Sequence, residues 1–256
     1  MKKYLSVFGL YARSTVLRFT LILIAMCAAQ AGLLMLRYHK LSGSGAFKIE
    51  ECVDGSGVQI ALAAAFLLLT AVLSVPGAAG GTRYTMERLR VSEKTAFGLH
   101  AAAAALTCFT LWAAEICFFY AFGLWFVRAL SPASGEQVIF LAFYRSDFLH
   151  SLLPLQDAAL WVRNFLFVAA MGLAAAETPL LARKKRHSFT VLPAAVFVIC
   201  FFVRGLTTEK NLTPAVVMLI AVLLKILFDY AVTKEVTPDE SPEEPEGSLF
   251  AAGDAP

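Results

Sequence analysis

The sequence contains six apolar blocks, and their lengths constrain the fold more than any other feature. The blocks cover residues 19–36, 58–75, 96–127, 158–181, 189–203 and 213–232. A helix needs about 20 mostly apolar residues to cross a bilayer. Hydrophobic residues make up 59% of the chain and charged residues 16%, so a soluble fold would expose large apolar patches. We therefore predict an all-α, polytopic membrane protein with six transmembrane helices.

Two parts of this pattern depart from a simple series of spans. The block at 96–127 would reach about 48 Å as a helix, so it must tilt, project from the membrane or break. Between the third and fourth blocks, 138–144 and 148–155 are apolar but too short to span, and we predict an interfacial or re-entrant segment there. We expect the first block to be a membrane helix rather than a cleaved signal peptide.

The positions of lysine and arginine predict the orientation, because cytoplasmic loops carry an excess of both residues. With both termini inside, 13 of them lie in cytoplasmic segments and 8 in outer segments. The densest clusters, at 83–94 and 183–186, fall on the same side. We predict a multi-pass cell-membrane protein with cytoplasmic N- and C-termini. Residues 1–235 form the membrane domain, and the acidic, proline-rich segment 236–256 forms a disordered cytoplasmic tail.

The sequence lacks the common catalytic and metal-binding motifs. It contains neither a nucleotide-binding P-loop nor an H-E-x-x-H zinc motif, and its cysteines form no C-x-x-C pair. We predict a chain that is not an enzyme and holds no cofactor or metal; the net charge of +3 gives no indication of nucleic-acid binding. We expect Cys27, Cys108, Cys117 and Cys200 to be buried among apolar side chains, and Cys52 to be a free thiol in a polar loop.

The charged segment 82–95 lies between the second and third blocks, on the predicted cytoplasmic side. Tyr84, Glu87, Arg88 and Val91 are spaced i, i+3, i+4 and i+7, so a helix here would be amphipathic. Ser92 is placed to cap the helix that follows. An ordinary positively charged loop is the alternative interpretation of this spacing.

Residues 84–92 read Tyr-Thr-Met-Glu-Arg-Leu-Arg-Val-Ser. This stretch resembles the cytoplasmic loop after the second helix in permease subunits of ATP-binding-cassette transporters of the type-2 exporter class. Those loops follow a Tyr-Thr-x-x-Arg-Leu-Pro-Val-Ser pattern, from which this sequence departs at Arg90. Six spans, cytoplasmic termini and a chain of this length are also similar to that class.

The resemblance implies a function and a set of partners. Such permeases form homo- or heterodimers in the lipid bilayer, and each docks a separate cytoplasmic ATPase subunit that binds the ATP. Carried onto this sequence, the side chains that contact the ATPase are Arg83, Tyr84, Glu87, Arg88 and Arg90. The resemblance thus implies the permease subunit of an ATP-driven export system.

Two other functions are compatible with the sequence. The first is a non-transporting assembly or sensory subunit that recruits a cytoplasmic partner through the same segment. The second is an intramembrane enzyme that uses Glu115 and a histidine. Glu115 lies midway along the third block, where an ionised carboxylate is costly, so we expect it to face other helices or a wet cavity. It either contacts transported substrate or a partner helix, or is a hydrogen-bonded structural carboxylate, paired with a cation.

The remaining charged residues in the blocks also have candidate roles. Lys225 and Asp229 are spaced i, i+4 and are expected to neutralise each other. Asp157 and Arg163 mark the outer start of the fourth helix, where they could gate a translocation path. Glu177 is expected to form hydrogen bonds nearby.

Overall fold

The computed structural model describes residues 2–43, 48–74, 92–130, 137–183, 188, 190–203 and 212–235. These residues form helices and no strands, which confirms the all-α prediction for the described part of the chain. The helices are α1 (Lys2–Ser42), α2 (Ile49–Asp54), α3 (Val58–Ser74), α5 (Glu93–Leu130), α6 (Gln137–Arg145), α7 (Asp147–Leu152), α8 (Ala158–Arg183), α9 (Val191–Val203) and α10 (Leu212–Glu235).

Each of the six apolar blocks coincides with a helix, and four of these helices are long and apolar enough to cross a membrane. The four candidate spans are Thr15–Ser42, Lys94–Ala129, Ala158–Pro179 and Leu212–Asp229. α3 has 17 residues and α9 has 13, so both fall short of the roughly 20 residues that a span needs. The protein is therefore a membrane-embedded helical bundle, whose described residues contain four candidate spans and two shorter apolar helices.

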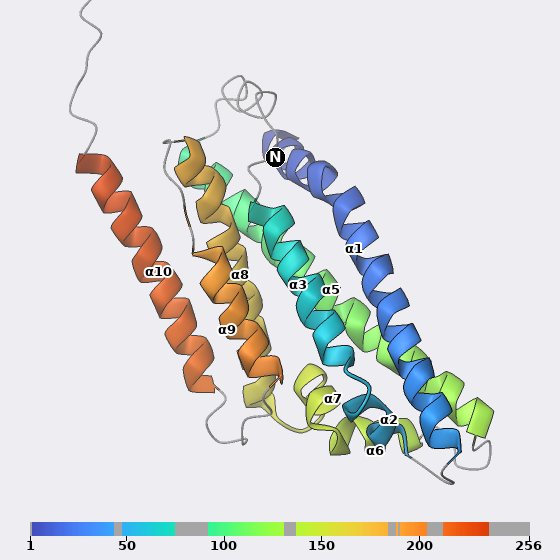
Figure 1. Ribbon diagram of the computed structural model, residues 1–256. Coiled ribbons are helices and arrows are strands. Elements are labelled where there is room, and N and C mark those ends of the chain that lie inside the picture. The colour runs from blue at the N-terminus through green and yellow to red at the C-terminus, as the bar shows by residue number, and fades with distance from the viewer. Residues whose placement is uncertain are drawn as a thin grey trace, which may run out of the picture.

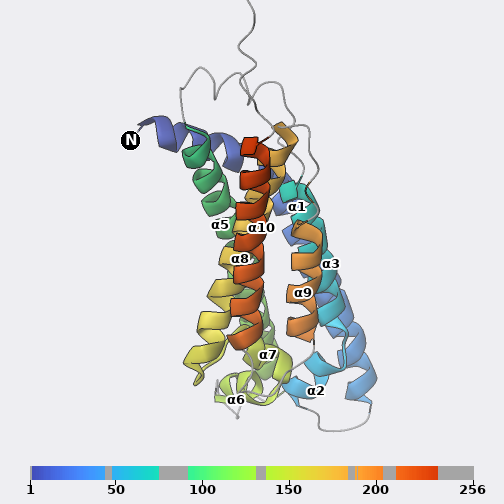
Figure 2. The same ribbon diagram turned by 90° about the vertical axis from the view of Figure 1, so that its left-hand side faces the viewer.

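The long helices lie side by side in an elongated bundle with two distinct ends (Figures 1 and 2). The first residues of α1 and the last residues of α10 lie at the same end, which we call the terminal end. The short helices α2, α6 and α7 lie at the opposite end, which we call the cap end. α10 occupies one edge of the bundle, where it packs against α8.

The third apolar block forms one unbroken helix. α5 has 38 residues and would extend about 57 Å, and it runs obliquely across the bundle. Its start is capped as predicted, since the backbone N–H of Thr95 donates to the Ser92 hydroxyl oxygen at 3.3 Å. The two hydroxyl groups lie 2.7 Å apart, so Thr95 bonds to the cap where Glu often stands.

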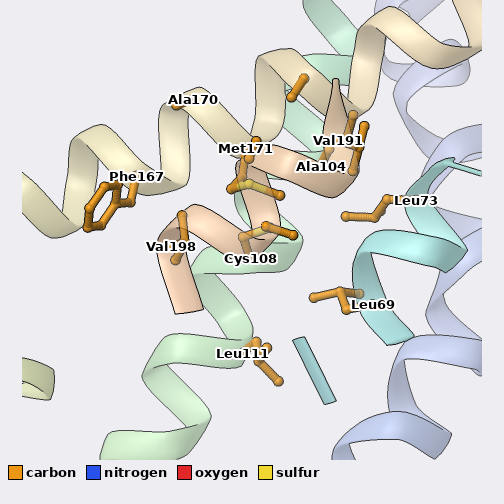
Figure 3. Close-up of a cluster of buried hydrophobic side chains, with 14 of the residues drawn as sticks. Leu69, Leu73, Ala104, Cys108, Leu111, Phe167, Ala170, Met171, Val191 and Val198 are labelled. Atoms are coloured by element: carbon orange, nitrogen blue, oxygen red, sulfur yellow. The ribbon is translucent and has the colours of Figure 1, made fainter. Parts of the chain in front are cut away.

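Two apolar clusters hold the bundle together. The first lies between α1, α3, α5, α8, α9 and α10, and its buried members include Leu69, Leu111, Met171 and Val198 (Figure 3). The second joins the cap helices to α1, α3 and α5. Because the outer surfaces of α1 and α10 carry exposed Leu, Val and Phe side chains, these surfaces suit a lipid environment better than water.

α5 and α8 pack backbone against backbone at Gly172. A Cβ atom at this position would lie 2.7 Å from the carbonyl oxygen of Ala101 and 2.7 Å from the Cβ atom of Ala105. Small residues on both helices let the backbones approach, which is the usual packing mode of membrane helices. The glycine therefore sets the spacing of the two helices that form the centre of the bundle.

The apolar pieces between the third and fourth blocks fold into α6 and α7, which pack with α2 as a cap over the bundle. Ser146 precedes α7 and donates from its hydroxyl to Asp54 of α2 at 2.5 Å. Arg145 forms an exposed ion pair with Glu50 of α2 at 3.5 Å. Burial raises the pKa of the Asp54 carboxyl, and the hydrogen bond from Ser146 opposes that rise. The two segments are thus helical and joined by polar contacts to a distant part of the chain.

The cysteines differ from expectation at three positions. Cys52 lies in α2 and is fully buried, so its placement in a polar loop was wrong, and burial raises the pKa of its thiol to about 11. Cys108 is buried as predicted and Cys27 is partly buried, whereas Cys117 and Cys200 are exposed on the helix surface. An apolar block marks residues shielded from water, and it does not separate those that face other helices from those that face lipid.

Candidate functional site

Glu115 is fully buried near the middle of α5, and its partner is a side chain of α1. The Gln30 amide donates from Nε2 to Glu115 Oε1 at 2.5 Å. Both residues have no exposed surface. Within the described residues, Glu115 Oε2 has no hydrogen-bond partner and Glu115 forms no ion pair. Glu115 is thus a hydrogen-bonded carboxylate, as one of the two interpretations expected, but its partner is the Gln30 amide and not a cation.

Glu115 lines a cavity of about 80 Å³ inside the bundle. Residues from α3, α5, α7, α8 and α9 form its walls, which are almost entirely apolar. Four aromatic side chains contribute, namely Phe66, Trp112, Phe148 and Phe167. An apolar pocket with few polar groups is the usual form of a small-molecule site.

A second polar cluster joins the start of α8 to α7. Arg163 is 2% exposed, and its guanidinium donates to the Ser151 hydroxyl at 2.7 Å and to Asn164 Oδ1 at 3.0 Å. Asn164 in turn donates to the Ser151 carbonyl oxygen at 3.0 Å. Asp157 accepts a hydrogen bond from the backbone N–H of Ala159 at 2.9 Å and so caps the first turn of α8. These contacts give both charged residues structural partners, and their gating role stays a prediction.

A third polar cluster lies toward the terminal end, between α8 and α10. Lys225 pairs with Asp229 as predicted, and its ammonium also lies 3.9 Å from Glu177 Oε1. The Ser188 hydroxyl donates to Glu177 Oε2 at 2.9 Å, so this carboxylate does bond locally. The cluster ties the peripheral helix α10 to the centre of the bundle.

Glu115 and His100 lie far apart on the same helix. His100 precedes Glu115 by fifteen residues on the same helix, which is about 22 Å along the axis. Its ring contacts Tyr11 at a centroid distance of 4.3 Å. No group of three potential metal ligands occurs among the described residues.

The predicted partner-contact residues lie outside the described residues. These are Arg83, Tyr84, Glu87, Arg88 and Arg90. The sequence matches no family model, and no curated protein or solved structure is significantly similar to it.

Sequence reasoning missed Gln30 as a member of the site. A signal was present, because Gln30 is a polar residue in the middle of the first apolar block. Ser151 gave no such signal, since it lies in a short segment of mixed polarity.

The arrangement around Glu115 is suited to binding a small molecule inside the bundle.

Proposed function

We propose that the chain is the permease subunit of an ATP-driven export system. It forms the translocation path and couples through the 82–95 segment to a separate ATPase subunit, which binds and hydrolyses the ATP. The observation that carries this proposal is the similarity of residues 84–92 to the coupling loop of type-2 exporter permeases. The proposal rests on the resemblance of this one segment, in a helical bundle that has four candidate membrane spans among its described residues.

The arrangement of the helices supports the role given to this segment. α3 ends and α5 begins toward the terminal end of the bundle, where α1 starts and α10 ends (Figure 1). The end of α3 and the start of α5, which flank this part of the chain, therefore lie on the same side as the first residues of α1 and the last residues of α10. With the termini in the cytoplasm, the segment is on the side where a soluble ATPase can reach it.

Six spans follow if α3 and α9 also cross the membrane. At 1.5 Å per residue α3 would reach about 26 Å and α9 about 20 Å. α9 packs against both α3 and α8, and its opposite face carries the exposed side chains of Leu192 and Val196. Local thinning of the bilayer accommodates short spans at modest cost. The apolar outer faces of α1 and α10 suit lipid and a second permease subunit, identical or not.

The proposal predicts that substitution in the 82–95 segment releases an ATPase. Affinity purification of the tagged protein from mild detergent is expected to recover an ATP-binding-cassette ATPase with the wild type. With an Arg83→Ala/Arg88→Glu variant, the amount of ATPase recovered is expected to fall about tenfold or more. Arg83→Ala removes one favourable contact with the ATPase, and Arg88→Glu replaces another with charge repulsion. The amount of ATPase recovered is measured by quantitative mass spectrometry.

A matched variant controls for the change in charge. Lys48→Glu/Arg145→Ala alters two basic residues near the cap end, both exposed, and is expected to retain the ATPase. Recovery of no nucleotide-binding protein, even after cross-linking in intact membranes, would contradict the permease function. A non-transporting subunit with another partner would then be the better explanation.

A further inference from the structure

We propose that the cavity at Glu115 binds an alkylammonium group, that is, a protonated amine carrying a short apolar chain. The claim that such an amine is transported rests on the proposed permease function. The binding site itself rests on three features of the bundle: a buried carboxylate oxygen without a partner, an apolar cavity beside it, and aromatic walls.

The first feature is the unsatisfied half of the Glu115 carboxylate. Gln30 supplies one N–H to Oε1, and Oε2 has no partner among the described residues. The Gln30 amide oxygen Oε1 is also buried without a partner, so the pair leaves two acceptor oxygens unsatisfied among the described residues. A buried polar atom without a partner costs about 1–3 kcal/mol. The carboxylate is thus poised to accept a hydrogen bond from a ligand.

The charge of the ligand follows from the surroundings of Glu115. An ionised carboxylate within a membrane bundle is normally paired with a cation or faces water. Glu115 forms no ion pair within the described residues. A primary ammonium group would donate an N–H to Oε2 and neutralise the charge in one contact. A neutral alcohol could supply only the hydrogen bond.

The size and lining of the cavity determine the length and the polarity of the chain that the amine carries. Its volume of about 80 Å³ is far below the about 300–1,000 Å³ of sites for drug-sized molecules, so it suits a chain of a few carbons. Leu62, Leu111 and Met171 provide apolar wall, and Phe66, Trp112, Phe148 and Phe167 add aromatic rings. Aromatic faces attract ammonium groups that have left water. The lining therefore favours both the chain and the cation.

The test compares n-butylammonium with n-butanol, which has nearly the same shape and no charge. Calorimetric titration uses the permease alone in lipid nanodiscs, with empty nanodiscs as the reference for partitioning. We expect n-butylammonium to bind the wild type at least tenfold more tightly than n-butanol. In Glu115→Gln this preference is expected to disappear. Glu177→Gln, which removes a buried carboxylate outside the cavity, is expected to keep it.

A second variant retains the carboxylate and fills the space. Ala63 lines the cavity, and Ala63→Leu is expected to lower the affinity for both n-butylammonium and n-butanol. The proposal is overturned if wild type binds both ligands equally or neither, in which case water alone satisfies Oε2. It is also overturned if Glu115→Gln keeps the preference. Since no ATPase is present, these results are independent of the co-purification test, and either proposal can fail without the other.

Discussion

Replacing Gly172 with alanine is expected to lower the stability of the bundle by about 1–3 kcal/mol, the usual cost of overpacking a well-packed core. The added methyl group would meet the Ala101 carbonyl oxygen and the Ala105 Cβ atom at 2.7 Å. Neither is the end of a flexible side chain, so α5 and α8 must move apart. A shift in thermal unfolding in detergent, followed by the loss of the monodisperse size-exclusion peak, measures the effect. Gly172→Leu is expected to prevent stable folding.

A glycine on the same pair of helices provides the control. Gly98 lies on α5, and a methyl group added there would have no neighbouring atom within 4 Å, so Gly98→Ala meets open space. Alanine favours a helix over glycine by about 1 kcal/mol, and this variant is expected to be as stable as the wild type or slightly more so. Equal unfolding temperatures for Gly172→Ala and Gly98→Ala would show that α5 and α8 are less tightly packed at Gly172 than these distances indicate.

Replacing Arg163 with alanine is expected to cost about 2–4 kcal/mol. The guanidinium bonds to the Ser151 hydroxyl and to Asn164 Oδ1 in a buried site, and each acceptor left without a donor costs about 1–3 kcal/mol. Arg163→Lys keeps the charge but lacks the planar fork that reaches both acceptors, so an intermediate loss is expected. Thermal unfolding measures both variants.

The control for Arg163 is Arg128, an exposed residue in the last turn of α5. Arg128→Ala is expected to change stability by less than about 0.5 kcal/mol. The comparison also distinguishes the structural role from the gating hypothesis. If Arg163→Ala unfolds like the wild type but loses transport, the structural role of this residue is wrong and a gating role is favoured.

The sequence predicted features that depend on near neighbours. Long apolar runs are helical because a helix satisfies every backbone hydrogen bond within one segment. The Ser92 cap depends on a residue three positions away, and the Lys225–Asp229 pair on one four positions away. In both cases the helix geometry alone places the partners together.

Contacts between distant segments could not be predicted in this way. Gln30 and Glu115 are separated by 85 residues, and Asp54 and Ser146 by 92. Their pairing depends on which faces of the helices meet, and an apolar block in a membrane protein is apolar on most of its faces. The burial of Cys52 follows from the same cause, because α2 is covered by the distant helices α1 and α6.

The location of the 82–95 segment relative to the membrane tests the proposed function most directly. Single cysteines are introduced by Arg88→Cys and Arg145→Cys in a variant with all five native cysteines replaced, and intact cells are treated with a membrane-impermeant maleimide. We expect labelling at position 145 in intact cells, and at position 88 only after permeabilisation. Labelling at position 88 in intact cells would place the segment outside, where no cytoplasmic ATPase could dock, and would contradict the proposed function.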